Sequence, residues 1–287
     1  MSESTEFMRR LGFPADAIET LETARRSLQA QKELLPLFRA AEEAIFCHGK
    51  GDFRMFLAEI AERSGIRRET ADMVFLISCL PRLLEEYQKH DIPEKIFRDS
   101  MDDLRCKLWE CYRVRGIWGT FVTEWYPGFY RLERFALGRL QYEHTAFPFD
   151  NVPGLKQGQT VYNCHIPSSG PLTPGSVSDS LARAKAFFAN ELNGGGMPVY
   201  CHSWLLYPPI VALFSENSNL RRFAERFTLL KSIPDPENQS FWRIFDRPWE
   251  PGIVVSDLPD DTSLRRTLKA FFQCGNTMGF GEAILWA

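Results

Sequence analysis

Apolar residues recur at spacings of three and four along roughly the first 120 residues of the chain, with charged residues between them. This is the pattern of amphipathic helices, which bury one face and leave the other in water. It runs through residues 18–46, continues through 53–90 with interruptions at Gly65 and Pro81, and resumes at Pro93. Proline is favoured in the first turn of a helix, so Pro93 marks a helix start. The amino-terminal half is therefore predicted to be a layer of helices.

After about residue 117, aromatic and β-branched residues and turn formers replace the helical period. Residues 135–143 alternate polar with apolar side chains, as a half-buried strand does. Further strands are predicted at 160–167, 197–206, 241–245 and 280–286, and helices at 177–193, 220–230 and 264–272. Such alternation indicates an α/β arrangement for this half. We expect an α+β protein with a helical domain at 1–125 and a mixed α/β domain at 126–287.

Charge and composition argue against several classes of partner. The net charge of −3 arises from 34 basic and 37 acidic residues without a block of like charges, so we expect no nucleic-acid partner. No stretch of about 18 apolar residues occurs, and the amino terminus lacks the apolar core of a signal peptide, so we expect no membrane partner. Seven cysteines without a CxxC pair suit a reducing compartment. The expected location is the cytoplasm; the oligomeric state is not indicated.

The segment HIPSSGPLTPGSVSDSL, residues 165–181, joins an apolar run to a predicted helix. Ser176 followed by Asp179 predicts an N-cap at Ser176. The free N–H groups and positive end of such a helix form a seat for phosphate or another anion. A plain tight connection has the same composition, and Pro171 and Pro174 each remove one donor. An anion site and an ordinary turn both stay open at this point.

Several blocks of the chain resemble a known family. They are RLERFALGRLQYE, HIPSSGPLTPGSVSDSLARAKAFF, CHSWLL, FWRIF and the pair DTSLRRTL and GFGEAIL. These blocks resemble the signatures of bacterial acyltransferases that combine a helical N-terminal acyltransferase domain with a GNAT-like C-terminal domain. IPEKIFRDSMDDLRCKLWECYRVRG, in the helical half, is similar too. The resemblance therefore spans nearly the whole chain.

The resemblance implies an acyl-CoA-dependent N-acyltransferase that acts on an amine. In GNAT enzymes, splayed central strands admit the pantetheine arm of the donor and the amine attacks the thioester directly. Residues 160–167 would be the central strand, and acyl-CoA pyrophosphate would bind the loop after it, at Ser168, Ser169, Gly170, Leu172 and Ser176. The loop departs from the usual Q/R-x-x-G-x-G/A pattern, since SSGPLT contains one glycine and one proline. The alternative is a degenerate GNAT-like fold that serves as a non-catalytic ligand-binding or interaction module.

Three residues are candidates for the acid or base of such a reaction. Glu143 lies on the polar face of its predicted strand, where several GNAT enzymes carry a carboxylate base. His165 ends its strand just before the loop, and an imidazole titrates near neutral pH. His202 lies on the next predicted strand. The alternatives are a solvated surface glutamate and histidines that serve only in the core.

Two Cys-His doublets, Cys164-His165 and Cys201-His202, raise the questions of a metal site and a cysteine nucleophile. Neighbouring strand residues point to opposite faces, so each doublet offers one ligand to a shared site, and two ligands do not make a zinc site. We expect no metal and inert, buried cysteines. Residues 56–77 imitate a helix-turn-helix, but the second helix contains MVFLISCL, which demands burial rather than exposure in a DNA groove.

Overall fold

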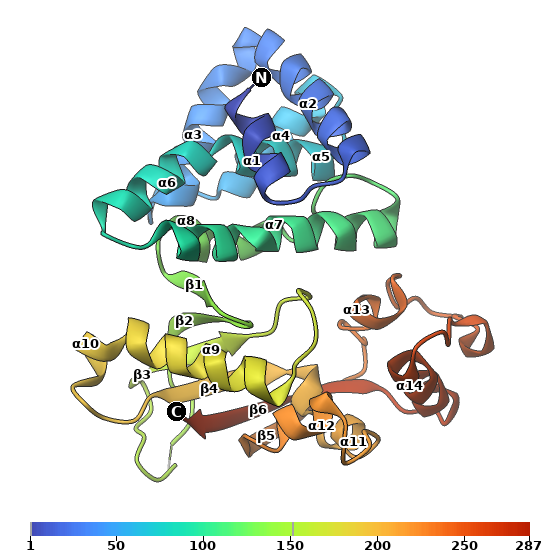
Figure 1. Cartoon of the computed structure of the whole chain (residues 1–287). Coiled ribbons are helices and arrows are strands. Elements are labelled where there is room, and N and C mark those ends of the chain that lie inside the picture. The colour runs from blue at the N-terminus through green and yellow to red at the C-terminus, as the bar shows by residue number, and fades with distance from the viewer. Residues whose placement is uncertain (1, 151) are drawn as a thin grey trace. The chain divides into compact units, whose positions relative to one another are not determined.

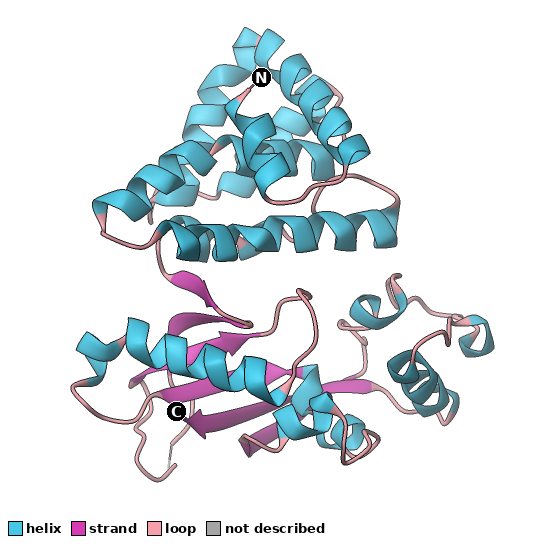
Figure 2. Ribbon diagram, in the orientation of Figure 1, coloured by secondary structure: helices cyan, strands magenta, loops and turns pink. Residues whose placement is uncertain are grey.

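The computed structural model describes residues 2–150 and 152–287, which form two compact units, Met1–Phe135 and Ala136–Ala287 (Figure 1). The first unit is helical and the second contains a mixed sheet with helices (Figure 2). The predicted α+β class is therefore confirmed. None of the helices in the described part of the chain has both the length and the apolar character that crossing a membrane requires.

The first unit is built from eight α-helices and two short 3₁₀ turns among its described residues. They are α1 (Glu3–Arg10), α2 (Ala15–Ala30), η1 (Lys32–Leu34), α3 (Leu35–Phe46), α4 (Phe53–Ser64), α5 (Arg68–Ser78), α6 (Leu80–Lys89), α7 (Glu94–Arg115), η2 (Thr123–Trp125) and α8 (Pro127–Tyr130). Gly65 ends α4 in the left-handed conformation, with φ of 69°. The apolar residues 73–77 of α5 are all buried, so α5 has no free face for a DNA groove.

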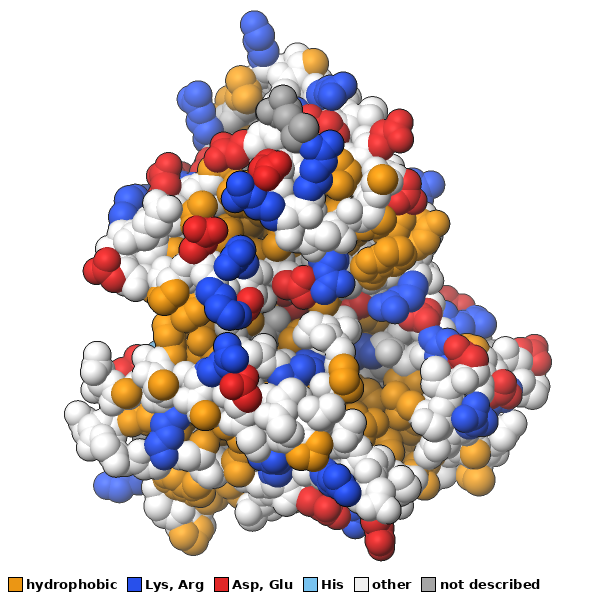
Figure 3. Space-filling view, in the orientation of Figure 1, with side chains coloured by type: hydrophobic (Ala, Val, Ile, Leu, Met, Phe, Trp, Pro, Cys, Tyr) orange, Lys and Arg blue, Asp and Glu red, His pale blue; other side chains and the backbone are white. Residues whose placement is uncertain are grey.

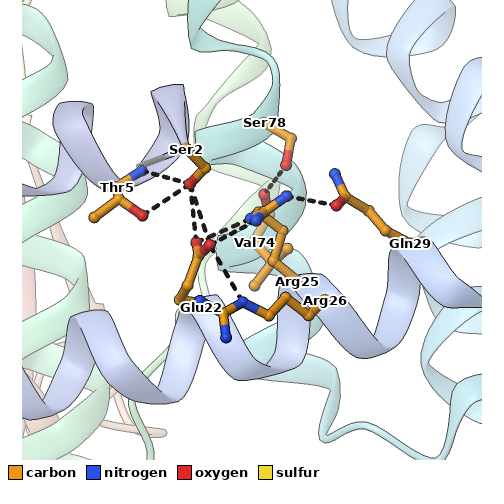
Figure 4. Close-up of polar contacts among 8 residues, drawn as sticks. All are labelled: Ser2, Thr5, Glu22, Arg25, Arg26, Gln29, Val74 and Ser78. Carbon is orange, nitrogen blue, oxygen red and sulfur yellow. Dashed lines mark hydrogen bonds and ion pairs between the residues drawn. The ribbon is translucent and has the colours of Figure 1, made fainter.

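A polar cluster fastens α1 to α2 (Figure 4). Ser2 caps α1 by accepting from the Thr5 N–H at 3.2 Å, and its hydroxyl also donates to the Glu22 carboxylate. Arg25 donates to the same carboxylate over 2.9 Å. The Arg25 hydrogen bond lowers the pKa of Glu22 to about 2. The Glu22 carboxylate thus accepts hydrogen bonds from both the capping residue Ser2 and Arg25.

The second unit is organised around a six-stranded sheet with the order β1-β2-β3-β4-β6-β5. The strands are β1 (Arg134–Leu137), β2 (Leu140–Ala146), β3 (Thr160–His165), β4 (Pro198–Ser203), β5 (Thr228–Asp235) and β6 (Met278–Trp286). Strands β2 and β3 are antiparallel, as are β4 and β6, whereas β3 and β4 run parallel. A parallel pair needs a crossover, and α9 (Pro174–Phe187) supplies it.

The two parallel strands pair over a very short distance. Across the described residues of both strands, the β3–β4 register holds Tyr162 opposite Val199 and Asn163 opposite Tyr200, and goes no further. By contrast, β4 stays paired with β6 as far as Ser203. Strands β3 and β4 therefore part toward their carboxyl ends, as the resemblance implies for the central strands.

One face of this sheet, here called the helix face, carries Tyr142 and Cys164 and is covered by α9. The Ser180 side chain of α9 bonds the Tyr142 hydroxyl at 3.1 Å and accepts from the Leu140 N–H. The remaining helical segments of the unit are α10 (Ala189–Leu192), η3 (Trp204–Leu206), α11 (Pro208–Val211), α12 (Asn219–Ala224), α13 (Trp242–Phe245), η4 (Val255–Asp257) and α14 (Ser263–Gln273). In Figure 1, α9, α11 and α12 lie in front of the strands. The opposite face, here called the site face, carries Glu143 and His165.

Three of the expected elements differ from those observed. Residues 241–245 were predicted as a strand, but Trp242–Phe245 form helix α13. The helical turn brings the rings of Phe241 and Phe245 together, with 4.7 Å between their centroids. The helix predicted at 220–230 ends at Ala224, and Thr228 begins strand β5. The strand predicted at 135–143 is two strands, since Gly138 adopts φ of 80° and turns the chain between β1 and β2.

The two glycines of the GFGEAIL block serve packing. A Cβ built on Gly281 would lie 2.2 Å from the Leu206 carbonyl oxygen, and one on Gly279 would lie 2.5 Å from the Tyr207 ring. The segment after β4 therefore crosses β6 in van der Waals contact with its backbone. Only glycine permits so close an approach.

We predict that Gly281→Ala destabilises the protein by about 1–3 kcal/mol, since a methyl group there must push the Leu206 backbone away. Urea unfolding followed by circular dichroism measures the effect. Gly175→Ala is the matched control, because nothing lies within 4 Å of its would-be Cβ. Equal stability of the two variants would show that the crossing segment does not rest on β6 this closely.

Candidate functional site

The centre of the candidate site is a contact between a carboxylate and an imidazole on the site face. In the β2–β3 register Gln141 lies opposite His165 and Glu143 opposite Asn163, so Glu143 and His165 are diagonal neighbours. Oε1 of Glu143 lies 2.7 Å from Nε2 of His165. The side chains are 20% and 18% exposed, so the pair is largely, though not fully, removed from water.

Asn163 completes this arrangement, and the sequence analysis did not single it out. Its Nδ2 donates to Oε1 of Glu143 at 3.2 Å and lies 3.3 Å from Nε2 of His165. Since an ionised carboxylate only accepts hydrogen bonds, Nε2–H of His165 donates to Glu143. The spacing of Asn163 and His165, two residues apart on one strand, was the available signal. The three side chains thus form one hydrogen-bonded group at the end of β3.

His202 lies on β4, beyond the last position at which β3 and β4 pair. Its exposed ring packs against Phe280 with centroids 4.7 Å apart, and Glu282 lies opposite it in the β4–β6 ladder. Partial desolvation by these neighbours lowers the pKa of His202, and the Glu282 carboxylate opposes the shift. The neutral imidazole is therefore the main form at neutral pH. The structure joins Glu143 to His165 and places His202 on the neighbouring strand.

The cysteines of the two doublets lie on the helix face. Cys164 and Cys201 are both buried, and the hydrogen bond between the two thiols together with burial raises the pKa of Cys164. A protonated, buried thiol is a poor nucleophile. All seven cysteines are free thiols. Within residues 2–150 and 152–287, no three His, Cys, Asp or Glu side chains gather as a metal site would require.

The loop after β3 leads into α9 with a different cap from the one predicted. The helix begins at Pro174, and Thr173 is its N-cap, accepting from the Ser176 N–H at 3.2 Å. The predicted cap at Ser176 is therefore wrong: Pro174 suits the first helical position and moves the start toward the loop. Asp179 instead pairs with Arg183 one turn later.

The structure divides the five predicted loop residues into two groups. Ser168, Ser169 and Gly170 are exposed, whereas Leu172 is 4% exposed and anchors the loop in the core. The N–H of Ser176 is occupied by the cap. The N–H groups of Ser169 and Gly170 have no hydrogen-bond acceptor among the described residues. The donors that a ligand would meet thus lie at the tip of the loop.

Two arginines that the sequence analysis did not select reach this junction. Arg139, in the turn before β2, donates to the carbonyl oxygens of Gly170 and Pro171 at 2.6 and 3.2 Å. Arg226, just after α12, donates to the Pro174 carbonyl at 3.1 Å and to the Ser178 hydroxyl at 2.9 Å. Both Arg226 bonds go to neutral acceptors, so the positive charge of Arg226 lies beside the amino terminus of α9, where the helix dipole adds to it. Elsewhere on the face shown in Figure 3, basic and acidic side chains are interspersed.

Family models match the chain along almost its entire length. The model of an N-acyltransferase N-terminal domain matches residues 2–132, and that of a GNAT-like C-terminal domain matches residues 134–285. No match was found among curated proteins.

Solved structures of acyltransferases share the fold. One, in complex with decanoyl-CoA and teicoplanin, is 21% identical with a TM-score of 0.80, over 99% of this chain and 87% of the other. A second, in complex with decanoyl-CoA, is 24% identical with a TM-score of 0.79 over 99% and 87%. A mutant acyltransferase in complex with octanoyl-CoA is 22% identical with a TM-score of 0.81 over 99% and 87%.

We predict that His202 titrates below the usual histidine pKa of about 6.5, and that Glu282→Gln lowers its pKa further. The reason is that the Glu282 carboxylate favours the imidazolium, so its loss leaves the desolvation unopposed. A pH series of histidine ring NMR spectra measures both values. A rise of the His202 pKa in Glu282→Gln would contradict the assigned surroundings.

Proposed function

Because the chain belongs to the N-acyltransferases with a GNAT-like C-terminal domain, we propose that its Glu143–His165 pair serves acyl transfer from acyl-CoA to an amine. The observation that carries the assignment is the 2.7 Å contact of this pair at the end of β3, where β3 and β4 part. The reaction is direct: the amine nitrogen forms a bond to the thioester carbonyl carbon, and the carbon–sulfur bond breaks. No enzyme nucleophile is needed, in keeping with the buried Cys164 thiol.

The proton of the attacking amine goes to the Glu143–His165 pair. The Nε2–H bond to Glu143 orients the imidazole ring, and Asn163 holds the carboxylate. General-base catalysis of this kind contributes about 10²–10⁴-fold to a rate. The departing thiolate of CoA takes up a proton, for which His202 on β4 is the proposed donor after it has gained one from solvent. The parted strands supply main-chain N–H groups to polarise the carbonyl.

The diphosphate of the donor would bind at the loop that follows β3. Exposed N–H groups of Ser169 and Gly170, together with Arg226, favour a diphosphate at the amino terminus of α9. Ser168 is exposed beside these amides, while Leu172 and Ser176 shape the loop rather than contact the donor. The guanidinium of Arg226 thus supplies positive charge to a loop that has few glycine amides.

The related structures guide the choice of substrates. Acyltransferases of this fold have been crystallised with octanoyl-CoA, with decanoyl-CoA and with teicoplanin. We propose a medium-chain acyl-CoA donor and an amine on a small molecule as acceptor, with neither nucleic acid nor membrane as partner. A bacterial source and a cytoplasmic location are further proposals, the latter supported by seven free thiols. The non-catalytic module is not favoured, because the family models and the solved structures that share the fold are of acyltransferases.

We predict that His165→Ala lowers kcat by about 10²–10⁴-fold with little change in the Kd of acyl-CoA, because proton removal is lost while the donor site stays intact. Thiol release from octanoyl-CoA in the presence of a panel of primary amines measures the rate. Glu143→Gln should lower kcat less, since an amide still accepts from Nε2–H.

The helix face offers a matched control. His144 and Glu191 form a second imidazole–carboxylate contact at 2.7 Å, away from the site face. His144→Ala should leave kcat within about twofold of the parent protein. Equal losses in His144→Ala and His165→Ala would show that neither pair acts on the amine.

We predict that Arg226→Gln raises the Kd of octanoyl-CoA by about tenfold or more, since a charged hydrogen bond to phosphate is lost. The Kd of S-octanoyl-pantetheine, which has no diphosphate, should not change. Calorimetric titration measures both, with exposed Arg222→Gln, on the preceding helix α12, as the control. If the variant weakens both ligands equally, Arg226 acts only through the fold.

A further inference from the structure

The site face continues past the gap onto β4 and β6, where one carboxylate has no ligand assigned to it so far. Tyr200 lies opposite Asn163 in the β3–β4 register, and its hydroxyl donates to Oε1 of Glu282 at 2.9 Å. Glu282 therefore shares the site face with the Glu143–His165 pair. We propose that Glu282 binds the acceptor amine in its ammonium form, an inference that rests on the proposed function.

The charge of the acceptor creates a need for such a residue. An alkylamine resembles the lysine side chain, whose pKa is about 10.4, so at neutral pH it is a cation. Moving a cation from water into a protein site is costly unless an opposite charge faces it there. An N-acyltransferase therefore needs an anionic group that is open toward its acceptor.

Glu282 has a carboxylate oxygen that is open in this way. Its Oε1 accepts from Tyr200, whereas its Oε2 has no hydrogen-bond partner within residues 2–150 and 152–287. Exposed Lys231 lies opposite it in the β5–β6 ladder, but in the described part of the chain these two side chains form no ion pair. Tyr200 is 7% exposed and Glu282 is half-buried. A buried phenol thus orients a carboxylate that a ligand can reach.

Aromatic rings flank this carboxylate. Phe280, two residues before Glu282 on β6, points to the same face, and its ring centroid lies 4.7 Å from that of His202. His202 lies opposite Glu282 in the β4–β6 ladder. A cation is attracted to the faces of aromatic rings as well as to a carboxylate. This combination suits an alkylammonium ion better than a neutral or anionic ligand.

The position of Glu282 brings the bound cation to the side of the gap. Strand β6 is the neighbour of β4, which borders the gap, and adjacent strands lie about 4.8 Å apart. On this face His202 lies between Glu282 and the gap, and it is exposed, so this row of the sheet is accessible to a ligand. His165 lies on the other side of the gap.

Binding at Glu282 forms no covalent bond and leaves the balance of the reaction unchanged. An alkylammonium ion and an acyl thioester give an amide, the CoA thiol and one proton. That proton leaves the nitrogen through the Glu143–His165 pair and passes to solvent. Glu282 holds the cation before this step.

Two amines of similar shape but different charge test the proposal. Ethylamine is a cation at neutral pH, whereas the fluorine atoms of trifluoroethylamine withdraw electrons and keep that amine neutral. In Glu282→Gln, kcat/KM for ethylamine with octanoyl-CoA should fall by about tenfold or more relative to trifluoroethylamine, because a charged hydrogen bond is lost. The comparison removes any effect of the substitution on His202, since both amines expel the same thiolate.

Binding without a donor gives a second, independent reading. In an NMR titration that follows the His202 ring, the Kd of ethylamine should rise about tenfold in Glu282→Gln, and Glu282→Asp, which keeps the charge, should recover part of the affinity. Glu191→Gln is the matched control, since Glu191 also accepts from a tyrosine hydroxyl, that of Tyr162 at 3.1 Å, away from the site face. It should leave both measurements unchanged. Thermal unfolding verifies that the variants fold.

Two results would overturn the inference while leaving the proposed function standing. One is an equal change of kcat/KM for the two amines in folded Glu282→Gln, which would assign the carboxylate to His202 alone. The other is an unchanged Kd of ethylamine in that variant. If the parent protein releases no thiol from octanoyl-CoA with any amine, the proposed function fails and this inference fails with it.

Discussion

The short pairing of β3 with β4 is the constraint on which the rest of the second unit depends. After Asn163 and Tyr200 the two parallel strands share no further register position among the described residues, although each continues toward its carboxyl end. Main-chain groups in a sheet interior are normally paired, so an opening of this kind is costly unless a ligand completes it. The extended, amide-containing arm of a CoA thioester has the chemistry to do so. The carboxyl end of β3 therefore borders this gap between the two strands.

The two faces of the sheet then hold different parts of the proposed reaction. The site face carries the hydrogen-bonded group of Glu143, Asn163 and His165, the proposed proton acceptor. The helix face carries the buried thiols of Cys164 and Cys201 and the amino terminus of α9, the proposed diphosphate site. In this proposal the amine attacks the thioester directly, and the buried thiols take no part.

Much of the fold could be predicted from the sequence because hydrophobic periodicity reports burial. The helical first half and the strand at 160–165 follow directly from it. Hydrophobic periodicity predicted the wrong element in two places. At residues 228–235, half-exposed apolar residues on an edge strand have a spacing that resembles a helix. At 241–245, a single helical turn is too short to show its period. The sequence shows a glycine at position 138, but it does not show that the backbone there is left-handed. That conformation, which divides one expected strand into two, depends on the surrounding structure.

The candidate site was predictable in part. Glu143 and His165 could be named as residues suited to proton transfer, but their contact depends on a strand register that sequence spacing does not contain. Asn163 has no distinctive chemistry alone and gains its role only from its neighbours. Arg139 and Arg226 come from segments about 30 and 50 residues distant from the loop that they contact, so only the fold brings them together. The N-cap was predicted at Ser176, three residues after the observed cap at Thr173, because Pro174 competes as a helix start.

A crystal structure of the protein with CoA tests the central claim most directly. The account requires the pantetheine arm to lie between the parted ends of β3 and β4, with the diphosphate within hydrogen-bonding distance of the amides at Ser169 and Gly170. The Glu143–His165 pair should then lie beside the sulfur end of the arm. Density for CoA elsewhere on the protein, with the gap between the two strands left closed, would contradict the account.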